Sequence, residues 1–94
     1  MSVAVKVPTM LRTYTRGESD VSVEVGAGAT LADVISTLDS DYPGIGSRIL
    51  DDTGAIRRFV NVYVGDDDVR FADGLQTPTP EGVRVSVIPA VAGG

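Results

Sequence analysis

The chain has 94 residues, of which 43% are hydrophobic and 22% charged, with thirteen acidic and eight basic side chains and a net charge of −5. This length and composition predict one globular domain over residues 1–94 and exclude a disordered chain. The sequence contains no Cys, His or Trp, which excludes disulfides, thiolate metal sites and the commonest general base.

The charge balance and the apolar runs indicate which partners to expect. The acidic excess argues against nucleic acid, whose binders cluster Lys and Arg. It fits either partners with positive docking surfaces or simple solubility. No apolar run approaches the roughly 20 residues of a membrane span, and the first residues lack the basic and apolar blocks of a secretion signal. We therefore expect a cytoplasmic protein with no membrane partner.

Alternating valines predict the first two strands. The first covers 3–7 and ends at Pro8, and the second covers 21–25. Both show the two-residue period of a strand with one apolar face. The connection between them is long for a hairpin, and we expect Leu11 within it to point inward.

One helix is predicted from Thr30 onward. The Thr30 hydroxyl can cap the first turn, and Asp33 stands where a capping box places its acidic partner. An apolar stripe follows at helical spacing: Leu31, Val34, Ile35 and Leu38. Pro43 stops the helix just after Tyr42. We interpret this helix as core packing.

The middle of the chain is predicted to hold turns around a third strand. Residues 45–56 read as irregular, with a turn at 51–54. A strand covers 57–64, with three valines on its inner face and Phe59, Asn61 and Tyr63 on the other. A turn at 65–68 then leads to a short strand at 69–71. The adjacent aspartates in these turns lack the spacing of a calcium loop, so we predict no metal site.

The end of the chain has the most informative pattern. Alternating valines predict a last strand over 83–88, and Pro89 removes a ladder donor, so pairing should stop there. Ala90, Val91 and Ala92 are small, and Gly93 and Gly94 have no Cβ. We predict that 89–94 forms a projecting tail. Five residues beyond Pro89 reach roughly 16 Å, enough to thread a narrow channel and place the Gly94 carboxylate in a partner's active site.

The order of the predicted elements defines an α+β fold. Two strands form a hairpin, the helix crosses over, and the remaining strands complete a mixed sheet of four to five strands packed on one main helix. The last strand most simply lies beside the first and parallel to it. This is the β-grasp, or ubiquitin-like, arrangement.

With its terminal Gly-Gly, this arrangement resembles the ThiS/MoaD sulfur-carrier family. More narrowly, three stretches are similar to the CysO-type carriers of cysteine biosynthesis. They are 7–12 (VPTMLR), 58–71 (RFVNVYV followed by Asp66, Asp68, Val69, Arg70 and Phe71) and 89–94 (PAVAGG). The tail is shared across the wider family, and the first two stretches favour the cysteine branch.

The resemblance implies a carrier, not an enzyme, with no catalytic residue and no bound cofactor or metal of its own. A ubiquitin-activating-type enzyme would use ATP and Mg²⁺ to adenylate Gly94, and sulfide or a persulfide would displace AMP to leave a thiocarboxylate. A pyridoxal-phosphate cysteine synthase would then supply an aminoacrylate to which the sulfur adds. After an S-to-N acyl shift, a zinc peptidase would release cysteine.

The resemblance also implies roles for the residues of the tail, and we add candidate docking residues on the outer face of the predicted sheet. Gly94 carries the chemistry, Gly93 gives access, and Ala90 to Ala92 would occupy the partner's channel. We expect Ile88 to belong to the docking surface, because an exposed apolar patch needs a reason. Phe59 and Tyr63 are its candidate neighbours, and partial burial under a loop is an equal alternative for these two.

Three alternatives remain at this point. The chain could be a MoaD-like or ThiS-like carrier for molybdopterin or thiamine synthesis. It could be a ubiquitin-like modifier that forms isopeptide bonds through Gly94. It could also be a β-grasp interaction subunit whose tail is incidental. A standalone enzyme fits least, since the acidic clusters fall in turns.

Overall fold

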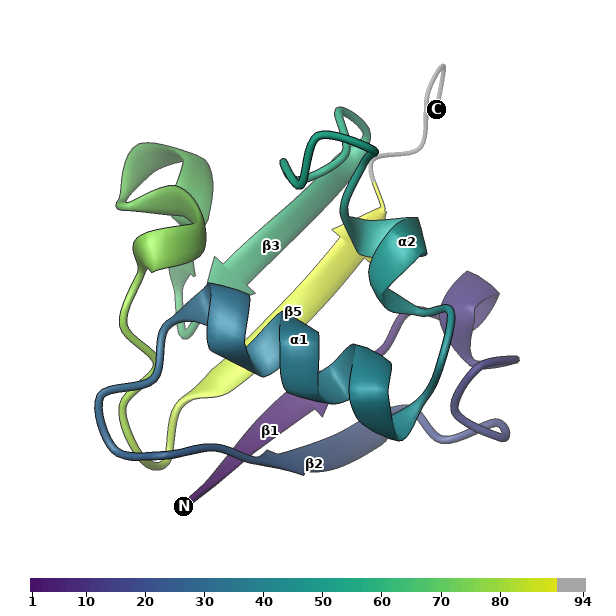
Figure 1. Ribbon diagram of the computed structural model, residues 1–94, viewed down its shortest axis with the longest axis horizontal. Coiled ribbons are helices and arrows are strands. Elements are labelled where there is room, and N and C mark those ends of the chain that lie inside the picture. The colour runs from purple at the N-terminus through teal and green to yellow at the C-terminus, as the bar shows by residue number, and fades with distance from the viewer. Residues whose placement is uncertain (90–94) are drawn as a thin grey trace.

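The computed structural model describes residues 1–89, which form a mixed five-stranded sheet with its helices packed on one face (Figure 1). The strands run in the order β2-β1-β5-β3-β4. Their bounds are β1 Ser2–Lys6, β2 Asp20–Glu24, β3 Val60–Val64, β4 Asp67–Asp68 and β5 Arg84–Pro89. Two helices, α1 Leu31–Asp41 and α2 Gly46–Ile49, and three single 3-10 turns, η1 Thr9–Leu11, η2 Val69–Phe71 and η3 Gly74–Gln76, complete the chain.

The valine alternation places one face of every long strand in the core. β1 pairs antiparallel with β2 and parallel with β5, with Val5 opposite Val85. β3 pairs antiparallel with β5, with Val62 opposite Val87. These four valines are buried, and full burial of such a side chain contributes about 1.5–3 kcal/mol. The predicted parallel neighbours, the first and last strands, are therefore confirmed.

Helix α1 begins with the predicted capping box. The Thr30 amide donates to Asp33 Oδ2 at 2.9 Å, and the Asp33 amide donates to Thr30 Oγ1 at 3.5 Å. These bonds satisfy amides that have no partner within the helix. The predicted stripe is buried on the sheet: Leu31, Val34, Ile35 and Leu38. The helix ends before Pro43, as the sequence indicated.

The prediction that residues 45–56 are irregular was wrong at their start. Helix α2 covers Gly46–Ile49, and the side chains of Ile45 and Ile49 flank it in the core. Asp39 Oδ1 accepts the Gly46 amide at 2.8 Å and so fixes the start of α2 against α1. One turn is too short for the helical period to show in the sequence. The turn at 51–54 is confirmed by Asp51 Oδ1, which accepts the Thr53 amide at 2.9 Å.

The strand boundaries differ from the prediction by one residue in β1, β2 and β5 and by more than one residue in β3 and β4. β3 begins at Val60, so 57–59 lies before it in a turn. Residues 69–71, predicted as a short strand, form η2, and the strand is β4 at 67–68. The reason is local. The Arg70 amide donates a hydrogen bond to Asp68 Oδ1 at 2.9 Å, and this contact starts a 3-10 turn where strand pairing would otherwise continue. Val60 is only half-buried, so the inner face of β3 is Val62 and Val64.

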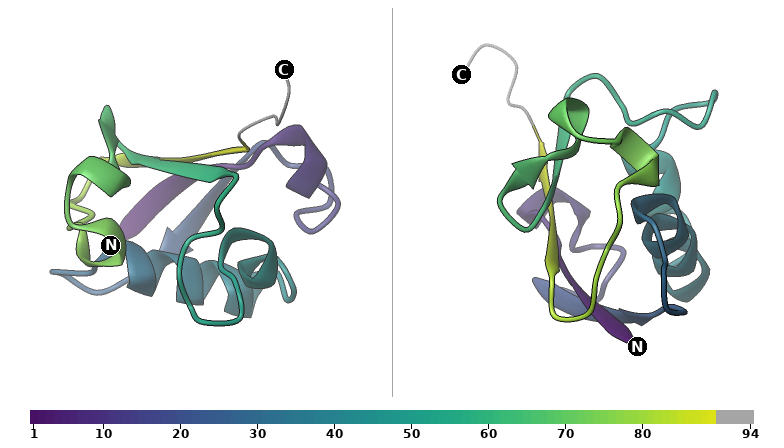
Figure 2. Two further views of the ribbon diagram at one scale, coloured as in Figure 1. Left: turned by 90° about the horizontal axis from the view of Figure 1, so that it is seen from above. Right: turned by 90° about the vertical axis from the view of Figure 1, so that its left-hand side faces the viewer.

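The two faces of the sheet differ. α1 and α2 cover one face, and among residues 1–89 no helix lies over the other (Figure 2).

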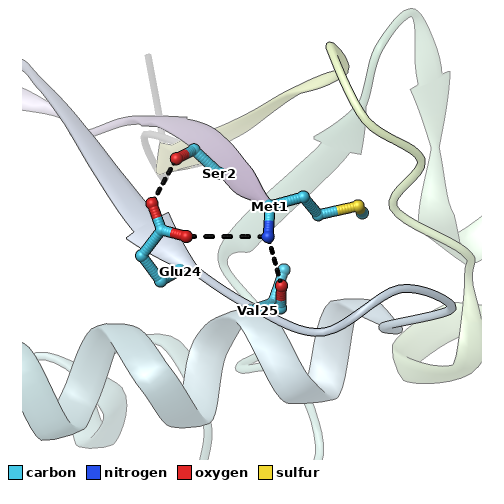
Figure 3. Close-up of polar contacts among 4 residues, drawn as sticks. All are labelled: Met1, Ser2, Glu24 and Val25. Carbon is cyan, nitrogen blue, oxygen red and sulfur yellow. Dashed lines mark hydrogen bonds and ion pairs between the residues drawn. The ribbon is translucent and has the colours of Figure 1, made fainter.

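At the start of β1 the Met1 ammonium donates to the Val25 carbonyl at 2.9 Å and pairs with Glu24 at 3.6 Å, while the Ser2 hydroxyl also bonds Glu24 (Figure 3). The hydrogen bond from Ser2, and then the ammonium charge, lower the pKa of Glu24. None of the described helices is long and apolar enough to cross a membrane.

Candidate functional site

The structure shows where the predicted tail leaves the sheet. Gly94, Gly93, Ala92, Val91 and Ala90 lie outside the described residues. Pro89 is the last described residue, and it is part of β5, in register with Val60 of β3. The sequence predicted a strand over 83–88 with the tail beginning at Pro89, and this boundary was wrong by one residue. A proline is compatible with the end of a strand, where it lacks only a donor.

The strand that carries this end is held on both sides. β5 pairs with β1 along one edge and with β3 along the other (Figure 1). Its inward side chains, Val85 and Val87, are buried against the helices. The pairing with β1 ends at Ser86, and the pairing with β3 continues to Pro89. Pro89 is therefore held by β3 and by the packing of β5, and it provides the origin for the five residues that follow it.

Ile88 lies on the outer face, as predicted. Its side chain is 45% exposed, and its register partner on β3 is Asn61. It borders a shallow groove between the end of β5 and the chain that follows β1. The groove is lined by Lys6, Val7, Pro8, Thr9, Met10, Arg12, Ser86, Val87, Ile88 and Pro89. A docking role for Ile88 stays a prediction, but the surface beside it is hollow and largely apolar.

Sequence reasoning missed the other wall of this groove. Met10 in η1 is 64% exposed, and Arg12 Nε donates to the Val7 carbonyl at 3.1 Å, which fixes Arg12 beside Pro8. The signal was present in the predicted parallel pairing. Because Lys6 is opposite Ser86, the residues just after the first strand must lie near Ile88.

The two candidate aromatic neighbours of Ile88 lie in different places. Phe59 is 56% exposed in the turn before β3, next to Val60 and therefore near Pro89. Tyr63 is half-buried farther along β3, opposite Ser86 on one side and Asp68 on the other. Phe59 is thus the better placed of the two to extend the surface around the end of β5.

Arg70 holds the segment that carries Phe59, and sequence reasoning assigned it no such role. Its Nη2 donates to the carbonyls of Arg58 at 2.9 Å and Val60 at 2.8 Å. The Arg58 guanidinium in turn lies 5.5 Å from the centre of the Phe59 ring, a cation–π distance. η2 therefore fixes the turn before β3 from the side.

The shifted pKa values of Asp51 and Arg48 have local structural causes. Hydrogen bonds from Thr53 lower the pKa of Asp51 in the 51–54 turn, and the Tyr14 hydroxyl, 2.8 Å from Arg48 Nε, raises the pKa of Arg48. Among residues 1–89, no three acidic side chains gather where they could hold a metal ion. What the site offers is a fixed strand end, an apolar groove and basic side chains around it.

A mixed sheet with this strand order, packed on one main helix, defines a ubiquitin-like β-grasp protein. A family model described as the ThiS family matches residues 5–94. The chain therefore belongs to the ThiS family, as its resemblance indicated.

Individual relatives span the whole chain. The sulfur carrier protein CysO of Mycobacterium tuberculosis is 48% identical over all of both chains, and its crystal structure matches with a TM-score of 0.87 over 95% of this chain and 99% of that one. The CysO chain in the crystal structure of the Amycolatopsis orientalis BexX/CysO complex matches with a TM-score of 0.88 at 42% identity, over 98% and 99% of the chains. Small archaeal modifier protein 3 of Haloferax volcanii is 36% identical over 83% of this chain and 84% of its own.

Proposed function

We propose that the chain is a sulfur carrier for cysteine biosynthesis, with its Gly94 carboxyl group as the attachment point. The observation that carries the proposal is the end-to-end identity of 48% with proteins named sulfur carrier protein CysO. The geometry supports it, because β5 is paired with β1 as far as Ser86 and with β3 as far as Pro89. Five residues of small or modest size then lead to Gly94, and Gly93 would fit a narrow partner channel.

The proposed chemistry takes place in partner active sites. The Gly94 carboxylate attacks the α-phosphorus of ATP held by a ubiquitin-activating-type enzyme, and pyrophosphate leaves. Sulfide then attacks the acyl adenylate, AMP leaves with the carbon–oxygen electron pair, and the product is a Gly94 thiocarboxylate. If a partner's persulfide attacks instead, the product is an acyl disulfide, and a second thiol must attack the partner's sulfur, forming a disulfide with it and releasing the Gly94 thiocarboxylate. Adenylation is needed because a free carboxylate would have to expel oxide, a far poorer leaving group than AMP.

The same proposal names the later partners. A pyridoxal-phosphate cysteine synthase accepts the sulfur, and a zinc-dependent peptidase hydrolyses the amide that joins cysteine to Gly94. ATP, Mg²⁺, pyridoxal phosphate and zinc belong to these enzymes, and the carrier is their co-substrate. We place the chain in the cytoplasm, where ATP is available. A CysO chain from A. orientalis has been crystallised in a complex with BexX, which supports a carrier that works by docking on other proteins.

We assign docking to the groove beside the end of β5. Ile88 and Met10 supply exposed apolar surface at its two walls, and Phe59 extends that surface toward β3. Docking here places the partner where the tail begins. Tyr63, which is half-buried, has the weaker case.

The test is the intact mass of the protein purified from its own cells. A thiocarboxylate adds about 16 Da, the difference between sulfur and oxygen, and an added cysteine residue identifies the pathway. Protein that stays unmodified in cells starved of cysteine would refute the carrier role. A mass that shows the thiocarboxylate but never a cysteine adduct would favour a MoaD-like or ThiS-like carrier for molybdopterin or thiamine.

A second candidate has its own observation. The identity of 36% with small archaeal modifier protein 3 favours a ubiquitin-like modifier whose Gly94 forms isopeptide bonds with lysine. Conjugates of higher mass in cell extract, resistant to thiol reagents, would support this reading. We prefer the carrier because its relatives are more similar over the whole chain. If a chain without its last two glycines kept full function, the tail would be incidental.

A further inference from the structure

The chain is acidic overall, yet basic side chains gather at one end of it. Six of its eight basic residues surround the end of β5, and the other two are Arg16 and Arg84. We call these six the basic rim: Lys6, Arg12, Arg48, Arg57, Arg58 and Arg70. In Figure 1, α2, the segment at 50–59 and the purple turn η1 all gather at this end of the molecule.

Four of the six line two hollows that share one residue. Lys6 and Arg12 line the groove beside Ile88. Arg48 and Arg57 line a second hollow, which shares Met10 with the first. Each of the three arginines donates a hydrogen bond from Nε. Arg12 donates to the Val7 carbonyl, Arg48 to the Tyr14 hydroxyl and Arg57 to the Ser47 carbonyl. Among the hydrogen bonds of residues 1–89, none uses the Nη nitrogens of these three arginines, so these nitrogens can donate to a carboxylate of a partner.

The other two members lie on the β3 side. Arg58 precedes Phe59 in the turn that leads to Val60, the register partner of Pro89. Arg70 reaches the same turn through the carbonyls of Arg58 and Val60. Basic groups therefore border the end of β5 on the β1 side, on the α2 side and on the β3 side.

Acidic side chains lie at both ends of β5. Near the rim, Asp20 is opposite Lys6, and Asp51 and Asp52 line a hollow together with Arg57. At the opposite end the acidic side chains have fewer basic neighbours. Glu24 lies at the start of β1 (Figure 3). Asp66 lies in the turn whose first residue, Gly65, donates to the Arg84 carbonyl at 2.8 Å, and Glu81 lies in the turn just before β5. The six residues of β5 separate the two ends by roughly 18 Å. The asymmetry along β5 therefore comes from the basic residues, which are concentrated at its end although the net charge of the chain is −5.

The basic rim is not neutralised by pairing among the described residues. The ion pairs found within residues 1–89 join Met1 to Glu24 and Arg84 to Asp20, and neither includes a rim residue, although Asp20 lies opposite Lys6. Asp51 is the carboxylate that acts on it most clearly, since the charge of Arg57 contributes to the lowered pKa of Asp51. Charges held in place and left without a partner favour a complementary surface on another protein.

We propose that the basic rim docks on an acidic border around the channel of the adenylating enzyme, with Ile88 and Met10 filling the apolar centre. This inference rests on the proposed function. It adds the sign of the charge that the docking surface of the adenylating enzyme should carry. An acidic border would attract the end of the chain that carries Gly94 and repel the end that carries Glu24. Polarisation would therefore orient the carrier before contact.

The experiment uses the full chain, its adenylating enzyme and ATP–pyrophosphate exchange. Arg58→Glu reverses one rim charge and removes no hydrogen bond made by its side chain among the described residues. Arg84→Glu is the matched control, because it changes the net charge equally at the far end of β5. We expect kcat/KM to fall about tenfold for Arg58→Glu and less than twofold for Arg84→Glu. Arg58→Lys should restore most of the rate.

Salt gives a second measurement that a folding defect would not reproduce. Wild-type kcat/KM should fall as ionic strength rises and the Debye length shrinks from about 30 to 8 Å, and Arg58→Glu should show a shallower fall. Equal losses for both reversals, or a wild-type rate independent of salt, would overturn the inference alone. A wild-type chain that supports no exchange at all would overturn the proposed function together with the inference.

Discussion

Replacing Ile88 tests whether the groove beside β5 is a docking surface. The side chain is 45% exposed, and full burial of an isoleucine contributes about 1.5–3 kcal/mol. Covering the exposed part on docking is therefore worth about 0.7–1.4 kcal/mol. At 1.4 kcal/mol for each factor of ten, Ile88→Ala should lower kcat/KM for adenylation by about three- to tenfold.

A charged replacement separates docking from folding more sharply. In Ile88→Glu the apolar contact is lost and a carboxylate must leave water on docking, which costs more than the contact itself. Lys6 and Arg12 border the groove and would offset part of that cost, so we expect a loss of at least tenfold. Phe71→Glu is the control, because Phe71 is 89% exposed and does not line the groove.

The assay is ATP–pyrophosphate exchange with the adenylating enzyme, accompanied by thermal unfolding of each variant. Both Ile88 variants should remain folded at the assay temperature, although the unfolding temperature should fall by several degrees, because just over half of the side chain is covered in the free chain and its loss costs about 1 kcal/mol. Unchanged exchange by Ile88→Glu would remove Ile88 from the docking surface. An equal loss in Phe71→Glu would show that any added charge slows the reaction, and the groove would then have no special role.

Three further outcomes are expected. Removing the last two residues should abolish sulfur delivery without changing the urea midpoint, and delivery by the shortened chain would refute a role for Gly94. Thr30→Ala breaks the capping box with Asp33 and should cost about 1 kcal/mol of unfolding free energy; a change below about 0.3 kcal/mol would show that the box contributes little. The folded-state pKa of Asp51 lies below its ordinary value of 3.8, so its contribution to stability is present above that pH and is lost as the pH falls through the folded value. Thr53→Ala should raise the Asp51 pKa in a carboxyl NMR titration, and an unmoved pKa would show that the hydrogen bonds from Thr53 are not its cause.

The fold could be predicted because each long strand and the main helix have a pattern that is visible in the sequence. Period-two valines give the long strands, and the Thr30–Asp33 box with its apolar stripe gives α1. The elements that were missed are short. α2 is a single turn fixed by a carboxylate from α1, and η2 depends on the side chain of Asp68. Such contacts arise from tertiary geometry or from a single side chain, which no periodicity records.

The docking site was predictable only in part, for a related reason. Ile88 could be found because it lies on a strand whose faces the valines define. Met10 and Arg70 could not, because each reaches the site from another element: η1 across the parallel β1–β5 pair, and η2 through carbonyls before β3. The basic rim shows this most clearly, since its six members come from five separate places in the sequence.

This arrangement explains how a chain without a general base can take part in group transfer. On the proposed function, the partners supply the chemistry and the carrier delivers one carboxyl group to several active sites in turn. Delivery would require a fixed origin, which β5 provides through its pairing with β1 to Ser86 and with β3 to Pro89, and a recognisable border around that origin. The net charge alone was compatible with positively charged docking surfaces on partners or with simple solubility. The distribution of charge in the folded chain points instead to an acidic partner surface, because docking depends on the face that carries the tail and not on the sum over the molecule.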